Sequence, residues 1–115
     1  MIADEITAHE AEDDPRNQHI LIYVDGKIVP RPEAKVSVYD SGFMLGDGVW
    51  EGLRFYNGTW AFLDEHINRL FEAAKAIDLD INLNKVELIT ALEKTRVANR
   101  ITKDLSLIHI SEPTR

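Results

Sequence analysis

Two short turn sequences constrain the fold of this 115-residue chain more than any other feature. Asp25-Gly26 and Asn57-Gly58 each follow a run rich in β-branched and aromatic residues, and a second extended run follows each pair. Pairs of this kind readily adopt the positive φ angles that a two-residue hairpin turn requires. The sequence therefore predicts two β-hairpins, one over residues 20–29 and one over residues 49–62.

Two helices are predicted after the second hairpin. Asp64 is the expected N-cap of the first, whose apolar stripe repeats at helical spacing through Ile67, Leu70, Phe71, Ala74 and Ile77. Asn84, with Glu87 three residues later, forms a capping-box pattern at the start of the second, which runs to about Asn99. Its expected inward residues are Val86, Ile89, Ala91 and Leu92. The predicted fold is α+β, an antiparallel hairpin-built sheet with two helices packed on one face.

The stretch between the two hairpins gives weaker signals. Val36-Ser37-Val38 has an extended pattern, and the glycines at positions 42, 46 and 48 predict a loop before the strand at residues 49–56. The spacing of Gly46, Gly48 and Gly52 does not fit a dinucleotide-binding loop, because that motif opens a helix and this segment leads into a strand.

Composition excludes several classes of function. Asp and Glu outnumber Lys and Arg by 20 to 13, which argues against a nucleic-acid surface. The absence of cysteine excludes disulfides and thiolate zinc sites, and the histidines lack the spacing of metal ligands, so no metal is expected. No apolar run approaches the ~20 residues that span a bilayer, and the acidic start does not resemble a signal peptide. A cytoplasmic protein with no membrane partner is expected.

The two ends of the chain are expected to lie outside the domain. Residues 1–18 carry six acids against one arginine and too little apolar surface to offset the entropy of ordering, so a flexible acidic leader is predicted. Residues 105–115, LSLIHISEPTR, match the translation of a common transposase sequencing adapter. We therefore expect a small domain at residues 19–104 and a non-native tail at residues 105–115. The tail should contribute nothing to folding, although its alternation could form a strand.

Two segments resemble a known family. The run from Gly42 to Asn57, GFMLGDGVWEGLRFYN, and the segment Glu65-His66-Ile67-Asn68-Arg69-Leu70 resemble the small-domain signature of class IV, fold type IV aminotransferases. These pyridoxal phosphate enzymes include branched-chain and D-amino-acid aminotransferases and aminodeoxychorismate lyase. The resemblance covers roughly residues 23–104. It implies transfer of an amino group between an amino acid and a 2-keto acid in a homodimeric enzyme of two domains.

The resemblance also implies roles for individual residues. Arg69 matches the arginine of the H-x-x-R element that grips the cofactor phosphate, whereas spacing alone would favour a solvated helix arginine. Leu45, Gly46, Trp50 and Gly52 match positions that line the substrate pocket; Trp50 could equally be a core or interface tryptophan. No catalytic residue is expected in this chain, because none of its six lysines matches the family's Schiff-base lysine.

The subfamily signal is mixed. Glu51-Gly52-Leu53-Arg54 resembles branched-chain aminotransferases, whereas Gly46-Asp47-Gly48-Val49 is common in D-amino-acid aminotransferases and the lyases. Glu51 and Arg54 should point to opposite faces of their strand. The favoured hypothesis is the N-terminal part of an aminotransferase, of branched-chain type, that is inactive by itself. The alternatives are a D-amino-acid aminotransferase or lyase fragment, or a small α+β module that binds a ligand or partner without catalysis.

Overall fold

A computed structural model describes residues 15–102 and 106–113 of the chain. Residues 1–14, which make up most of the predicted leader, lie outside the described residues. The chain divides into two compact units, residues 1–35 and residues 36–115.

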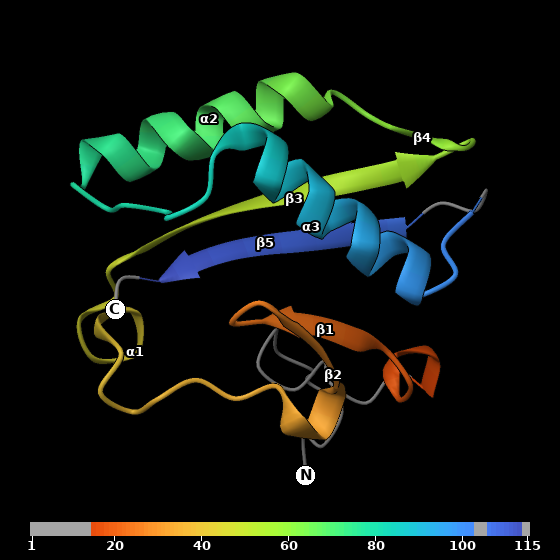
Figure 1. The fold of residues 1–115 in the computed structure, drawn as a ribbon, viewed down its shortest axis with the longest axis horizontal. Coiled ribbons are helices and arrows are strands. Elements are labelled where there is room, and N and C mark those ends of the chain that lie inside the picture. The colour runs from red at the N-terminus through yellow and green to blue at the C-terminus, as the bar shows by residue number, and fades with distance from the viewer. Residues whose placement is uncertain (1–14, 103–105, 114–115) are drawn as a thin grey trace, which may run out of the picture. The chain divides into compact units, whose positions relative to one another are not determined.

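The first unit contains the first predicted hairpin. Strands β1 (Leu21–Val24) and β2 (Lys27–Pro30) pair antiparallel, with Val24 opposite Lys27 (Figure 1). Asp25 and Gly26 join them with φ angles of 55° and 82°. These are the positive angles expected of a two-residue hairpin turn, so this prediction is confirmed. Short 3₁₀ helices at Pro15–Asn17 and Arg31–Glu33 flank the hairpin.

The second unit begins differently from the prediction. Residues 36–38 form no strand, and Val36 and Val38 are exposed. The expected loop contains a one-turn helix, α1 (Ser41–Leu45). Its first turn is capped by Asp40, whose side chain accepts a hydrogen bond of 2.8 Å from the Gly42 backbone nitrogen. Gly46 ends the helix at φ 72°, in the left-handed region that a side chain would disfavour.

A three-stranded antiparallel sheet forms the centre of this unit. The strand order is β4 (Thr59–Trp60), β3 (Gly48–Tyr56) and β5 (Ser106–Pro113). Asn57 and Gly58 close the β3–β4 hairpin at φ angles of 54° and 80°, as the sequence predicts. β4 is shorter than expected, because only Phe55 and Tyr56 of β3 have partners in it.

The strand β5 lies in the segment expected to be a passive tail. It pairs with β3 from Gly48, opposite Pro113, to Phe55, opposite Ser106. Ile110, opposite Glu51, packs against the hydrophobic core. The segment, in whose sequence apolar and polar residues alternate, therefore forms a strand along the edge of β3 opposite β4. Its non-native origin stays a prediction.

Deleting residues 105–115 tests whether this strand stabilises the fold. Since removal uncovers one edge of β3 and the core around Ile110, we expect the free energy of unfolding to fall by more than about 1 kcal/mol. Chemical denaturation of the full and shortened chains measures the difference. An unchanged midpoint would instead support the expectation that the tail is passive.

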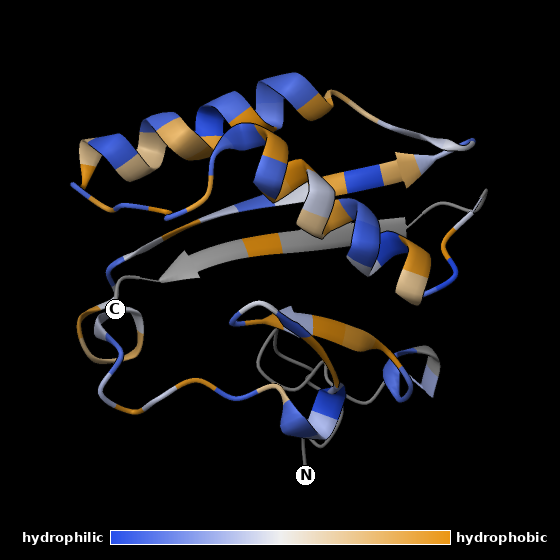
Figure 2. Ribbon diagram, in the orientation of Figure 1, coloured by the Kyte–Doolittle hydropathy of each residue, from blue (hydrophilic) through white to orange (hydrophobic). Residues whose placement is uncertain are grey.

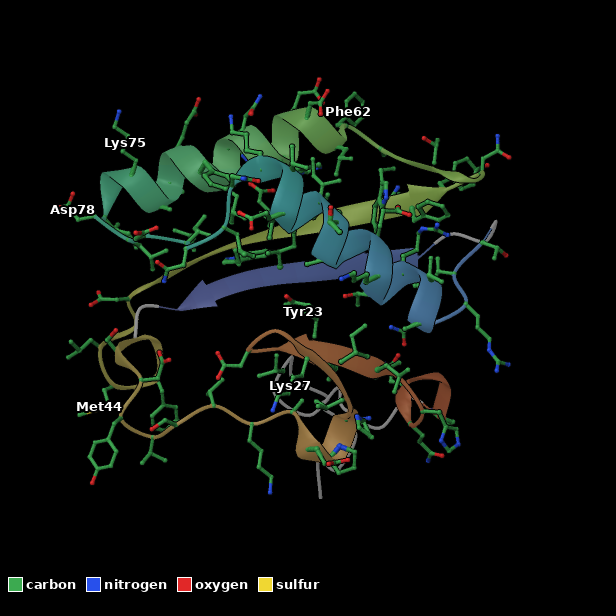
Figure 3. All side chains as sticks on the ribbon, viewed as in Figure 1. Tyr23, Lys27, Met44, Phe62, Lys75 and Asp78 are labelled. Carbon is green, nitrogen blue, oxygen red and sulfur yellow. The ribbon has the colours of Figure 1, made fainter. Side chains whose placement is uncertain are left out.

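The helix α2 (Leu63–Ala76) begins and ends slightly away from its predicted limits. Phe62, at φ 53°, takes the N-cap position, and Asp64 lies in the first turn, where its charge favours the positive end of the helix dipole. The prediction of Asp64 as N-cap is therefore wrong. Ile77 follows the last helical residue and is exposed, so its predicted inward position is also wrong. Phe62 and Asp78 mark the two ends of this helix in Figure 3.

The helix α3 (Lys85–Ala98) begins with the predicted capping box. Asn84 Oδ1 accepts from the Glu87 backbone nitrogen, and Glu87 Oε1 accepts from the Asn84 backbone nitrogen, at 2.8 and 2.9 Å. The buried residues are Leu88, Ala91 and Leu92. Val86 is exposed, contrary to the prediction, because the inward stripe passes through Leu88 instead.

Both helices pack on the same face of β3, as predicted. Along that strand the buried residues alternate with more exposed ones. Figure 2 shows that both hydrophobic and hydrophilic residues occur along β3. The core contains Val49 from β3, Ile67, Leu70 and Ala74 from α2, Leu88 from α3, and the connecting Leu79 and Ile81. The opposite face of β3 carries the exposed Trp50, Arg54 and Tyr56.

None of the helices in the described part of the chain has the length and apolar character needed to cross a membrane.

Candidate functional site

One acidic side chain interrupts the apolar face of β3. Glu51 lies between Val49 and Leu53 on the face that the helices cover, and only 7% of its side chain is exposed. A buried carboxylate needs cationic or hydrogen-bonding partners, since desolvation otherwise disfavours its charge. The local fold must therefore bring donors to this position.

The helix α2 supplies those donors from two residues one turn apart. Arg69 donates from Nε to Glu51 Oε1 and from Nη2 to Oε2, the latter at 2.8 Å. The His66 Nδ1 atom lies 2.7 Å from Oε2. Because an ionised carboxylate only accepts hydrogen bonds, Nδ1 carries the proton of this contact. Helical spacing places both side chains over β3, and Glu51 joins the strand to the helix.

The charge of Glu51 is strongly favoured at neutral pH. The Arg69 guanidinium, by its hydrogen bonds, and secondarily His66 hold the pKa of the Glu51 carboxyl at about 2, against an ordinary 4.5. Burial opposes this shift but does not cancel it. The pKa of Arg69 is raised by the same contact. The Glu51 carboxylate and the Arg69 guanidinium are therefore both ionised throughout the physiological range.

The low pKa predicts an acid-dependent loss of stability. Between pH 4.5 and about 2 the unfolded chain binds a proton at Glu51 that the folded chain does not. Stability from this group is thus fully present above pH 4.5 and is lost as the pH falls through the folded pKa. We expect unfolding free energies from denaturant titrations to fall more steeply over this range for the wild type than for Glu51→Gln. Parallel curves would show that this carboxylate is not held by its partners.

The exposure of Arg69 distinguishes it from a second arginine–glutamate pair. Arg96 of α3 also contacts a carboxylate, that of Glu93, through Nε and Nη2. Its Nη1 donates to the Ile101 carbonyl at 2.7 Å, its guanidinium lies over the Phe55 ring, and its side chain is 19% exposed. The Arg69 side chain is 68% exposed, and among the described residues no hydrogen bond from its Nη1 is found. The guanidinium nitrogens of Arg96 therefore all have acceptors within the fold, whereas Arg69 has N–H donors that remain available to an external acceptor.

The residues predicted for the substrate pocket lie elsewhere in the same unit. Trp50 and Gly52 belong to the face of β3 opposite Glu51, and Trp50 is exposed. Leu45 is the exposed last residue of α1, and Gly46 is its C-cap. The structure therefore brings Trp50 and Gly52 onto one face of the strand and places Arg69 on the other side.

Sequence reasoning missed Glu51 as a partner of Arg69. The signal was present, since Glu51 is the only charged residue at the alternate positions 49, 51, 53 and 55, which are otherwise apolar. Such an acid requires a cation from the covering layer. The prediction that Glu51 and Arg54 point to opposite faces is confirmed.

Comparison with known proteins gives a consistent family. The chain is 51% identical over 79 residues to a protein of Methanocaldococcus jannaschii provisionally named a branched-chain-amino-acid aminotransferase, covering 68% of this chain and 27% of that protein. It is 42% identical over 80 residues to a D-alanine aminotransferase of Listeria monocytogenes, covering 70% and 28%. Its homologues are fold type IV aminotransferases. The family resemblance drawn from the sequence is confirmed, while no family model matches the chain.

Solved structures of this family share the fold. A branched-chain aminotransferase of Thermoproteus uzoniensis, solved with norvaline, matches with a TM-score of 0.71 and 34% identity over 80% of this chain and 32% of its own. The branched-chain amino acid aminotransferase of Escherichia coli matches with a TM-score of 0.74 and 25% identity, covering 83% of this chain and 34% of its own. The predicted α+β class is confirmed. The chain spans about a quarter of the length of these curated relatives and a third of these structures.

Proposed function

We propose that this chain is the N-terminal small domain of a pyridoxal-phosphate-dependent aminotransferase that moves an amino group between a branched-chain amino acid and a 2-keto acid. The observation that carries the proposal is Arg69, an exposed arginine that a buried carboxylate holds on one side. Its position in the H-x-x-R element matches the phosphate-binding arginine implied by the family resemblance.

The donor set of Arg69 fits a phosphate group. A guanidinium has five N–H donors, and Glu51 accepts two of them. The remaining three belong to Nη1 and Nη2, which can form a two-pronged contact with phosphate oxygens. When bound, the cofactor supplies the electron sink of the reaction. This chain's contribution would be to hold its phosphate through Arg69.

The substrate side of the proposal rests on Trp50 and its neighbours. Trp50 and Gly52 lie on the face of β3 that neither helix covers, and Leu45 and Gly46 precede that strand. An exposed tryptophan offers a large apolar surface to a branched side chain. We propose that these four residues border the substrate pocket in the complete enzyme. The complete enzyme is further proposed, from the family resemblance, to be a cytoplasmic homodimer.

A D-amino-acid aminotransferase is the second candidate, because the D-alanine aminotransferases of Listeria reach 42% identity. Turnover assays of the complete gene product with 2-oxoglutarate and either L-leucine or D-alanine separate the two. We expect turnover with L-leucine. Preference for D-alanine would establish the second candidate, and no transfer from any amino acid would contradict both.

A further inference from the structure

The N–H donors of the Arg69 guanidinium form two sets. Its side edge, formed by Nε and one N–H of Nη2, contacts both carboxylate oxygens of Glu51. Its end edge, formed by Nη1 and the other N–H of Nη2, makes no hydrogen bond with the described residues. This arrangement fixes the plane of an exposed side chain that would otherwise sample many rotamers.

We infer that Glu51 is a positioning residue for anion binding: it holds the side edge of Arg69 so that the end edge is presented to the phosphate of the cofactor. This inference rests on the proposed function, since it assigns the phosphate to Arg69. His66 supports the same carboxylate from one turn earlier in α2. Arg96 differs, because its Nη1 donates to the Ile101 carbonyl. A pair with a carboxylate is therefore not enough to leave an arginine available to bind an anion.

The charge of Glu51 has a second effect on phosphate binding, opposite in sign to that of positioning. The negative charge of Glu51 partly neutralises Arg69 and by itself would weaken the attraction for an anion. Removal of that charge should therefore strengthen phosphate binding if charge dominates, and weaken it if positioning dominates. Two variants separate the effects, because Glu51→Gln removes the charge, whereas Glu51→Asp keeps it and withdraws the carboxylate by one methylene.

The test uses the 115-residue chain labelled with ¹⁵N, with inorganic phosphate as the probe and chloride at equal ionic strength as the control. In the wild type we expect the Arg69 Nε–H to exchange with water at least about fivefold more slowly than that of the exposed Arg54. Phosphate should shift the Arg69 signals and leave those of Arg96 unchanged. Both Glu51 variants should raise the phosphate dissociation constant at least about fivefold, with the backbone amide spectrum confirming the fold.

The outcomes distinguish this inference from the function on which it rests. If wild-type Arg69 responds to phosphate and both variants bind it as well or better, Glu51 does not position Arg69, and the inference is overturned while the phosphate role stands. If Arg69 exchanges as fast as Arg54, it is not held, which overturns the inference whether or not the variants fold. If wild-type Arg69 ignores phosphate, the proposed phosphate role fails and the inference fails with it.

Discussion

Replacing Arg69 with alanine in the complete enzyme is expected to weaken pyridoxal phosphate binding by about thirtyfold or more, because the change would remove the proposed charge-assisted, two-pronged contact to the phosphate. Arg69→Lys should give an intermediate affinity, since lysine keeps the charge but not the planar fork. Fluorescence titration of the apo enzyme measures both affinities. Wild-type affinity in a folded Arg69→Ala variant would show that another residue holds the phosphate.

The Arg69→Ala variant needs a control for stability, because the change also removes the contact of Arg69 with Glu51. Alanine is a good helix former, so α2 itself should survive the change. Loss of Arg69 nevertheless leaves the buried Glu51 carboxylate with His66 as its remaining partner, which lowers stability. The double variant Arg69→Ala/Glu51→Gln also removes the buried charge that has lost its arginine partner. It should recover thermal stability without recovering cofactor affinity, which separates binding from folding.

The purified 115-residue chain is expected to show no transaminase activity. None of its lysines matches the lysine that binds the cofactor covalently in the resembled family, and without that group the reaction has no covalent anchor. The measurement is turnover of L-leucine with 2-oxoglutarate, together with mass spectrometry after borohydride reduction in the presence of pyridoxal phosphate. Weak, scattered modification of surface lysines is expected, because exposed amines react generally.

A different pattern of modification would contradict this prediction. A stoichiometric pyridoxyl group at one lysine, accompanied by turnover, would show that the chain is catalytically complete. The six lysine→arginine variants would then identify the residue. Each keeps the positive charge of the side chain but cannot form the reducible adduct.

The parts of the fold that follow from local chemistry were predictable from sequence. The Asp25-Gly26 and Asn57-Gly58 turns and the Asn84–Glu87 capping box depend on neighbouring residues, and the structure contains all three. Positions decided by tertiary packing were less predictable. Phe62 replaces Asp64 as the N-cap because the chain enters α2 directly from the β4 hairpin, in a left-handed conformation that propensity does not anticipate.

The candidate site, like the fold, was predictable from the sequence only in part. Arg69 was identifiable from the H-x-x-R element of the resembled family, since spacing alone would favour a solvated helix arginine, and the structure leaves it exposed. Its contact with Glu51 joins residues 18 positions apart, on different elements, and helical spacing alone cannot predict such a pair. Only the alternation in β3, with one acid on an otherwise apolar face, indicates that a cation must cover it.

Sequencing the source DNA beyond the codon for Asp104 is the sharpest test of the claim that this chain is part of a fold type IV aminotransferase. We expect an open frame that continues into a second domain and contains a lysine followed by a family-like Asn-Tyr or Asn-Leu pair. The residues now read as 105–115 should be absent from that frame. A native stop codon soon after Asp104 would contradict this claim and favour a free-standing α+β binding module.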